Sequence, residues 1–377
     1  MKLLWLDLNS SYAHSSLALP ALHAQIADDT TIEWCVVSAT INENTGSVVN
    51  QIYHHQPDII AATNWLFNHE QLLHIVSRAK ALLPHCCIIL GGPEFLGDNA
   101  AFLYKNKFVS GVFRGEGEEV FPLWLKVWNH SKEAWKSITG LCYIDETNQY
   151  QDNGIARVMN FSQLISPEKS RFFNWSKPFV QLETTRGCFN TCAFCVSGGE
   201  KPVRTIPLEA IRERLNDIHQ HGIKNVRVLD RTFNYNNKRA KELLDLFRNY
   251  PDICFHLEIH PALLSEELKE ELSVLPKGLL HLEAGIQSLK ESVLQQSRRI
   301  GKLSDALERL KYLCSLKNME THADLIAGLP LYHLSEIFED VHTLAEYGAG
   351  EIQLESLKLL PGTEMRRRAE ELGIQYS

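Results

Sequence analysis

The sequence has 377 residues, of which 44% are hydrophobic and 22% are charged, and its formal net charge is −8 at pH 7. This length exceeds the size at which one core stops growing, so we expect two domains, and the composition excludes a largely disordered chain. The acidic balance argues against general nucleic-acid binding, because affinity for phosphates needs clustered Lys and Arg. No apolar run reaches membrane-spanning length and the start is too short for a signal peptide, so we expect a cytoplasmic protein without membrane partners.

Residues 1–130 alternate short β-rich runs with turns and amphipathic runs, which is typical of a parallel sheet covered by helices. Within 72–83, apolar residues recur at three- and four-residue spacing and predict a helix that packs on the sheet. We therefore expect a doubly wound, Rossmann-like α/β domain over 1–130. Its expected strands are 3–8, 32–37, 58–62, 87–90 and 108–113.

Residues 131–175 change character, because two β-like runs at 140–144 and 156–159 flank a polar, turn-rich segment and predict a connector with a hairpin. From 176 to 365 the alternation of strands and helices resumes. Six βα steps are too few for a complete barrel, so we expect a partial (β/α)6 TIM-type barrel with its site at the C-terminal strand ends, followed by a tail at 366–377. The six expected strands are 179–184, 226–230, 254–259, 280–286, 321–327 and 351–358.

Three of the nine cysteines, Cys188, Cys192 and Cys195, are spaced as CxxxCxxC directly after the first barrel strand. Three thiolates suit zinc or an iron–sulfur cluster, but a structural zinc site usually has a fourth Cys or His, and no His lies within twenty residues. A 4Fe-4S cluster on three cysteines has one iron open to a chelating substrate. For the other six cysteines, scattered in apolar segments, we expect small buried side chains.

This cysteine motif, with the aromatic Phe194 before its third cysteine, resembles that of the radical S-adenosylmethionine (SAM) superfamily. The resemblance implies that the open iron binds the amino and carboxylate groups of SAM. One electron from the cluster then cleaves SAM to a 5′-deoxyadenosyl radical. It also implies an electron donor such as flavodoxin or ferredoxin, and a substrate that the sequence does not identify.

Polar residues end the later barrel strands, where SAM is expected to bind. Two runs, 282–288 and 325–330, look like those of the radical SAM branch that includes oxygen-independent coproporphyrinogen oxidases and cobalamin-linked methylases. That likeness implies that Glu283 and Gln287 face the ribose, that Arg298 meets the SAM carboxylate, and that Gly328 gives room near adenine. For His260 and Glu355, a structural and a functional role are equally consistent with the sequence. The complete predicted SAM set is Phe194, Asp230, Glu258, Glu283, Gln287, Arg298, Gly328 and Gln353.

Four loops follow expected strands of the N-terminal domain, and glycines there let a large ligand approach the backbone. Gly-Gly-Pro-Glu at 91–94, followed by Arg-Gly-Glu-Gly-Glu at 114–118, resembles the cobalamin-binding domain that precedes many radical SAM modules. The resemblance implies cobalamin as a third cofactor. The predicted cobalamin residues are Asn9, Ser10, Tyr12, His14, Ser15, Asn64, Trp65, Gly91, Gly92, Pro93, Glu94, Gly115 and Glu116.

The chain departs from the related families in two ways. The Asp-x-His-x-x-Gly motif that supplies an axial histidine to many corrinoid proteins is absent, so His14 is not assigned as a cobalt ligand. A subgroup with a similar N-terminal segment and a similar 230–234 run usually continues beyond the position of Ser377, so we expect a substrate lid to be missing from this chain.

Three functions remain open from the sequence. The first is a cobalamin-dependent radical SAM methyltransferase acting on an unidentified substrate. The second is radical SAM rearrangement, cyclisation or oxidation without a corrinoid. The third is a non-catalytic protein with a structural or sensory iron–sulfur cluster, which the polar strand ends disfavour.

Overall fold

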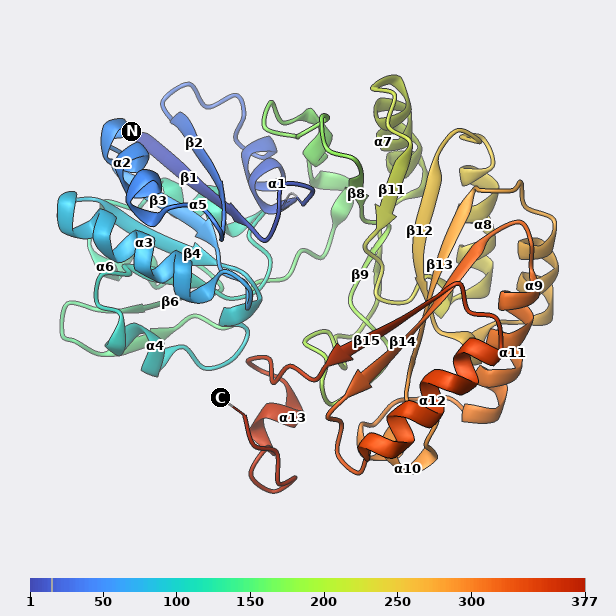
Figure 1. The fold of residues 1–377 in the computed structure, drawn as a ribbon. Helices are drawn as coiled ribbons and strands as arrows, with labels where there is room; N and C mark the ends of the chain where they lie inside the picture. The colour runs from blue at the N-terminus through green and yellow to red at the C-terminus, as the bar shows by residue number, and fades with distance from the viewer. Residues whose placement is uncertain (15, 377) are drawn as a thin grey trace. The chain divides into compact units, whose positions relative to one another are not determined.

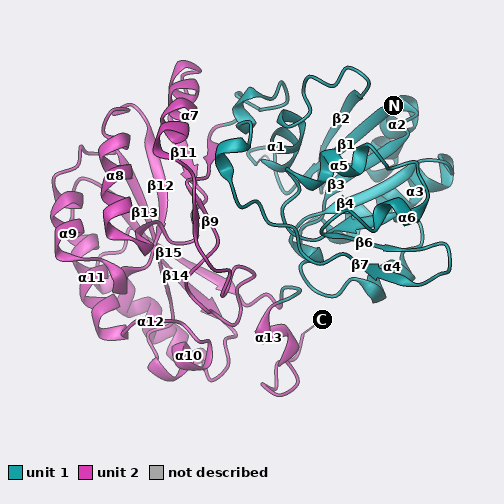
Figure 2. Cartoon of the chain, turned by 180° about the vertical axis from the view of Figure 1, so that it is seen from behind, with its two compact units in different colours: residues 1–177, 360–362 teal, residues 178–359, 363–377 magenta. Residues whose placement is uncertain are grey.

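The structure is a computed structural model that describes residues 1–14 and 16–376. The chain forms two compact units: unit 1 contains 1–177 and 360–362, and unit 2 contains 178–359 and 363–377 (Figure 2). Over the described ranges, no helix is long and apolar enough to cross a membrane.

Unit 1 is built on a seven-stranded sheet of order β2-β1-β3-β4-β5-β6-β7 (Figure 1). Its first five strands pair in parallel and β6 and β7 are antiparallel. The chain places β2 and β3 on opposite sides of β1, which is the strand-order reversal of a doubly wound sheet. The strands are β1 (Lys2–Asn9), β2 (Glu33–Thr40), β3 (Ile59–Thr63), β4 (Cys87–Gly91), β5 (Gly111–Phe113), β6 (Leu141–Ile144) and β7 (Tyr150–Asp152). The helices are α1 (Ala18–Ala24), α2 (Thr45–His55), α3 (His69–Leu82), α4 (Ala100–Lys105), α5 (Val120–Leu125) and α6 (Lys132–Trp135).

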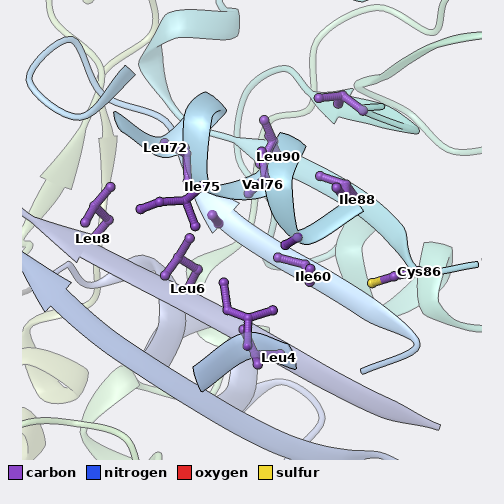
Figure 3. Close-up of a cluster of buried hydrophobic side chains, with 14 of the residues drawn as sticks. Leu4, Leu6, Leu8, Ile60, Leu72, Ile75, Val76, Cys86, Ile88 and Leu90 are labelled. Carbon is purple, nitrogen blue, oxygen red and sulfur yellow. The ribbon is translucent and has the colours of Figure 1, made fainter. Parts of the chain in front are cut away.

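Strand β1 is apolar along most of its length because both faces of the sheet are covered. Leu4, Leu6 and Leu8 face a core that includes α2 and α3, and Figure 3 shows Leu6 beside Ile75 of α3. Leu3 and Trp5, on the other face of the strand, belong to a second core with α1, α5 and α6. The sequence prediction of a Rossmann-like domain is therefore confirmed.

The predicted hairpin exists, but its second strand lies earlier than expected. Asp145 closes a short turn, in which its side chain accepts hydrogen bonds from the backbone of Thr147 and Gln149, so β7 begins at Tyr150. The expected strand 156–159 is wrong, because Ala156 forms a single bridge to Gly115 instead. The hairpin extends the sheet of unit 1 through β6.

Unit 2 contains six parallel strands in the sequential order β8-β11-β12-β13-β14-β15. Figure 1 shows α8, α9, α11 and α12 along one side of this sheet. Among the described residues no pairing joins β15 to β8, so the predicted open, partial TIM-type barrel is confirmed. Its strands are β8 (Val180–Leu182), β11 (Asn225–Val228), β12 (Cys254–Ile259), β13 (Leu280–Gln287), β14 (Glu320–Ala327) and β15 (Glu351–Ser356), with a small pair β9 (Thr185–Arg186) and β10 (Arg204–Thr205). The helices are α7 (Leu208–Gln220), α8 (Asn237–Phe247), α9 (Glu266–Ser273), α10 (Glu291–Gln296), α11 (Leu303–Ser315), α12 (Leu334–Glu346) and α13 (Glu364–Arg367).

Strands β12 and β13 alternate strictly between buried and partly exposed residues. Leu257 and Leu282 are fully buried, whereas His256 and Glu283, on the other face, are partly exposed. Because successive side chains of a strand point to opposite faces, the polar residues of these strands gather on one face of the sheet.

Candidate functional site

The loop that carries the three predicted cluster ligands is compact. Backbone hydrogen bonds join Cys188 N to Glu200 O at 3.0 Å and Gly199 N to Asn190 O at 2.7 Å, so the loop closes on itself. At Gly198, a Cβ atom would lie 2.5 Å from the carbonyl oxygen of Cys192. The loop therefore requires glycine at this position.

The three cysteines share this loop and none of them is in a disulfide. Cys188 and Cys192 are buried, Cys195 is half-buried, and all three are free. Burial raises the pKa of Cys192; the positive charge of Arg299 opposes this rise, and negative charge on the other two thiols adds to it. Metal ions bind thiolates, and three clustered thiols leave one iron of a cubane without a protein ligand. The residues present therefore fit a 4Fe-4S cluster with one open position.

Arg299 is a residue of this site that the sequence did not single out. Its Nη1 atom lies 3.8 Å from Cys192 Sγ, and its Nη2 atom donates a hydrogen bond to Gly285 O. A Cβ atom at position 285 would lie 2.7 Å from Gln287 Nε2 and 3.3 Å from Arg299 Nη2, so the glycine makes room for both side chains. The neighbouring Arg298, predicted to meet SAM, instead forms an ion pair with Glu364 at 2.6 Å.

Asp230 fastens the start of the cysteine loop. Its buried carboxylate accepts hydrogen bonds from the backbone N–H groups of Thr184 and Thr185 at 2.8 and 2.9 Å, and from the Thr184 hydroxyl. Burial raises the pKa of Asp230. These contacts join the ends of β8 and β11 immediately before the first cysteine.

The polar face of the barrel sheet brings together two predicted SAM residues. Burial raises the pKa of Glu258 to about 7, and the negative charge of Glu283 contributes to this rise. The hydrogen bond with His256 and the nearby imidazole of His322 outweigh burial at Glu283 and hold its pKa well below its usual range. Asp324 lies on the same face, where burial and the charge of Glu283 raise its pKa to about 8.

Three histidines on this face, His256, His281 and His322, were not predicted as site residues. Each occupies the second or third position of its strand, β12, β13 or β14. Each is followed two residues later by a carboxylate, which is Glu258, Glu283 or Asp324, respectively. The signal was present in the sequence as polar residues at alternate positions of otherwise apolar strands.

Two of the remaining predicted SAM residues, Gln287 and Gly328, lie at the ends of β13 and β14. Gln287 has a positive φ of 73° at an irregularity in the β13–β14 pairing, and Gly328 has a φ of 87°. Gln353 pairs in register with Asp324, and Phe194 packs partly buried against a small apolar cluster.

His260 and Glu355, whose roles the sequence left open, have protein partners. His260 Nε2 lies 2.8 Å from Ile300 O, and burial together with the charge of Arg299 lowers the pKa of His260 to about 3. Glu355 forms an exposed ion pair with Lys358.

In unit 1, the loops after β1, β3 and β4 meet at the C-terminal edge of the sheet. Asn64 is fully buried, and its Nδ2 atom lies 3.1 Å from His69 Nδ1. Asn68, which was not predicted, donates hydrogen bonds from Nδ2 to Leu8 O and Thr63 O and joins β1 to β3 at the strand-order reversal.

Gly91 and Gly92, two glycines of the predicted cobalamin set, lie beside Asn64 at the end of β3. Gly91 accepts a hydrogen bond from Asn64 N at 2.7 Å. Gly92 has a φ of 111°, and a Cβ atom there would lie 2.5 Å from Asn64 O. Pro93 and Glu94 continue into a short 3-10 turn.

The other predicted cobalamin residues fall into two groups. Gly115 forms a β-bridge with Ala156, and Glu116 accepts a hydrogen bond from Val158 N. Both residues therefore contact the segment 156–158 of the same chain. In the loops after β1 and β3, some side chains lie at the surface: Tyr12 is 76% exposed, and Trp65 stacks on Phe67. His14 Nδ1 lies 2.8 Å from Ser11 Oγ and 3.5 Å from Ser10 Oγ. Asn9 donates a hydrogen bond from Nδ2 to Asp7. Ser15 lies outside the described residues.

Two of the six other cysteines, Cys86 and Cys142, are buried as expected. Cys35, Cys87, Cys254 and Cys314 are half-buried.

Comparison with known proteins gives relatives for both units. The Radical SAM superfamily profile matches residues 182–344. An uncharacterised methyltransferase of Pyrococcus horikoshii is 26% identical over 286 residues, covering 73% of this chain. The cobalamin-dependent radical SAM methyltransferase TokK of Streptomyces tokunonensis is 20% identical over 339 residues, covering 85% of this chain. The chain spans 61% and 50%, respectively, of the lengths of these two relatives.

Solved structures share the fold. TsrM from Kitasatospora setae, with cobalamin and a 4Fe-4S cluster bound, has a TM-score of 0.76 at 16% identity, covering 98% of this chain and 78% of that chain. OxsB, with aqua-cobalamin and SAM bound, has a TM-score of 0.75 at 14% identity, covering 99% and 62%. The resemblance to the radical SAM superfamily predicted from the cysteine motif is confirmed: the chain carries a radical SAM domain at residues 182–344.

Proposed function

We propose that the protein is a radical SAM enzyme that reductively cleaves SAM and uses cobalamin to methylate a substrate not yet identified. The observation that carries the proposal is the single loop that holds three free cysteines at the start of the matched radical SAM domain. When bound, the cluster supplies the electron that cleaves SAM, and cobalamin carries the methyl group. A donor such as flavodoxin or ferredoxin reduces the cluster.

In this proposal the cysteine loop and the polar face of the barrel have separate tasks. Cys188, Cys192 and Cys195 hold the cluster, while Asp230 fixes the loop by its hydrogen bonds to Thr184 and Thr185. Arg299 places a positive charge beside the Cys192 sulfur. This charge stabilises thiolate over thiol at that position.

SAM is proposed to lie along the C-terminal strand ends, with Phe194, Glu258, Gln287, Gly328 and Gln353 around it. Glu283 is compatible with a ribose contact, because both of its imidazole contacts fall on Oε2 and Oε1 takes part in neither. Arg298 reaches the SAM carboxylate only if its exposed ion pair with Glu364 opens. Exposed ion pairs contribute about 0–1 kcal/mol, so such a change is inexpensive.

Cobalamin is proposed to bind at the C-terminal edge of the unit 1 sheet, against the loops after β1, β3 and β4. The support is the strand-order reversal there and the close packing of Gly92 on the backbone of Asn64, which brings the loops after β3 and β4 together.

A second function, radical SAM chemistry without a corrinoid, has one observation in its favour. Gly115 and Glu116, two of the predicted cobalamin residues, are engaged with residues 156–158 of their own chain. The loop after β5 therefore contributes less to a ligand site than the sequence pattern predicts.

One experiment separates the two functions. The protein is reconstituted anaerobically with iron and sulfide, with and without hydroxocobalamin, then reduced with dithionite in the presence of SAM. The methyltransferase proposal predicts retained corrinoid absorbance after gel filtration, and S-adenosylhomocysteine that forms only with cobalamin. Formation of 5′-deoxyadenosine alone, with no corrinoid retained, would favour the second function.

A further inference from the structure

Three neighbouring strands of the barrel place two imidazoles and a carboxylate together on the polar face. His256 lies on β12, Glu283 on β13 and His322 on β14. Glu283 pairs in register with His322, and His256 pairs with His281, two residues before Glu283. Because residues two apart on a strand share a face, all of these side chains point to the same side of the sheet.

The ligand-type atoms of this group converge. The Nε2 atoms of His256 and His322 lie 2.6 and 3.4 Å from the same carboxylate oxygen, Glu283 Oε2. The three side chains offer atoms that all lie within 4.8 Å of one another. One small ion can therefore contact all three.

His322 has a buried nitrogen that the protein leaves without a hydrogen bond. The residue is 5% exposed, and its Nδ1 atom lies 2.8 Å from His281 Nε2. Its Nε2 atom has no hydrogen-bond partner among the described residues, and neither has Asp324 Oδ1, which lies 3.5 Å away. Buried polar atoms normally have partners, so these two neighbouring atoms are available to contact a positively charged species.

We propose that His256, Glu283 and His322 form a binding site for a divalent transition-metal ion, with zinc as the reference ion, on the polar face of the barrel. Two imidazoles and one carboxylate are a common zinc ligand set in catalytic sites, with further positions left for water or substrate. Ligand atoms about 2.0–2.1 Å from a tetrahedral zinc ion lie about 3.3 Å apart. The His322–Glu283 separation of 3.4 Å already matches this value, and the His256–Glu283 pair must open by about 0.7 Å from its 2.6 Å hydrogen bond.

His281 and Asp324 act as supporting residues of the same site. A hydrogen bond between His322 Nδ1 and His281 Nε2 fixes the ring so that Nε2 points at the ion. Such second contacts to ligating histidines typically change metal affinity about 10–100-fold when removed. Asp324 Oδ1 is close enough to serve as a further ligand or to accept a hydrogen bond from a metal-bound water.

This site is chemically distinct from the cysteine loop, because it offers nitrogen and oxygen and no sulfur. A test by zinc X-ray absorption on the intact 377-residue chain can therefore separate the two. The protein is reconstituted with its iron–sulfur cluster, loose iron is removed with a chelator, and one equivalent of zinc chloride is added. We expect one zinc ion per chain with nitrogen and oxygen ligands, imidazole scattering, and no sulfur shell.

Variants locate the ion. His322→Asn is expected to lose bound zinc, His281→Gln to weaken zinc binding about 10–100-fold, and the exposed His342→Asn on α12 to bind zinc as the wild type does. If His322→Asn does not fold, as judged by circular dichroism, Glu283→Gln replaces it, because the amide keeps the shape of the carboxylate.

Two results would overturn the proposal. One is sulfur ligation of the added zinc, which would place it at the cysteine loop. The other is less than about 0.1 zinc per chain after gel filtration, which would mean that a proton between His322, Glu283 and Asp324 takes the place of the ion. Neither result depends on SAM cleavage, so a failure here is distinguishable from a failure of the proposed function.

Discussion

Replacing Asp230 with alanine tests how the barrel holds the cysteine loop. The substitution removes the acceptor of the Thr184 and Thr185 backbone N–H groups, which lie in residues that are themselves buried. Each buried N–H group left without a partner costs about 1–3 kcal/mol, so the two together cost about 2–6 kcal/mol of unfolding free energy. The Thr184 hydroxyl can rotate to another acceptor and is left out of this sum.

The matched control is Asp252→Ala. Asp252 is exposed and forms a surface pair with Lys224 at 3.4 Å, so its loss is expected to cost less than about 1 kcal/mol. Urea unfolding followed by circular dichroism under anaerobic conditions gives both values, and iron content after reconstitution is expected to fall in Asp230→Ala alone. A destabilisation within 0.5 kcal/mol of the control would refute the role assigned to Asp230.

Three further predictions concern separate parts of the molecule. Gly198→Ala places a Cβ atom 2.5 Å from Cys192 O, so the cysteine loop must shift and iron bound per chain should fall by at least half; unchanged iron content would contradict the tight packing. Asn68→Ala removes the side chain that joins β1 to β3 and should weaken hydroxocobalamin binding at least fivefold by equilibrium dialysis, whereas equal affinity would separate this side chain from the proposed cobalamin site. Burial lowers the pKa of Lys132 to about 8, below its unfolded value of 10.5, so as the pH rises the folded chain loses this proton before the unfolded chain does. The unfolding free energy of the wild type relative to that of Lys132→Met should therefore rise between pH 8 and 10.5. A difference in unfolding free energy that does not change with pH would contradict the shift.

The fold was largely predictable because most of its strands coincide with short runs of apolar residues in the sequence. Strand β1 needs apolar residues on both faces of the sheet, so Leu3 to Leu8 could be read directly as a buried parallel strand. The strand at 156–159 was misplaced because its position depends on the turn that Asp145 closes. Residues 156–159 have the composition of a strand, but of these only Ala156 forms a bridge, to Gly115.

The site was less predictable because side-chain roles depend on neighbours that are distant in sequence. Asp230 and Glu258 both end strands, yet Asp230 hydrogen-bonds to Thr184, 46 residues away, while Glu258 faces other carboxylates. The cysteines were found because their spacing is local. The relation of His322 to Glu283 depends on the register of two strands, which the sequence does not contain as a motif.

The central claim is that Cys188, Cys192 and Cys195 hold a cluster that cleaves SAM. The most direct measurement is 5′-deoxyadenosine, quantified by mass spectrometry after anaerobic reconstitution and dithionite reduction of the wild type and of Cys192→Ala. We predict SAM-dependent 5′-deoxyadenosine from the wild type and none above background from the variant, with circular dichroism showing that the variant is folded. Equal amounts from both proteins, or none from a wild type whose cluster is fully assembled and reduced, would contradict the assignment.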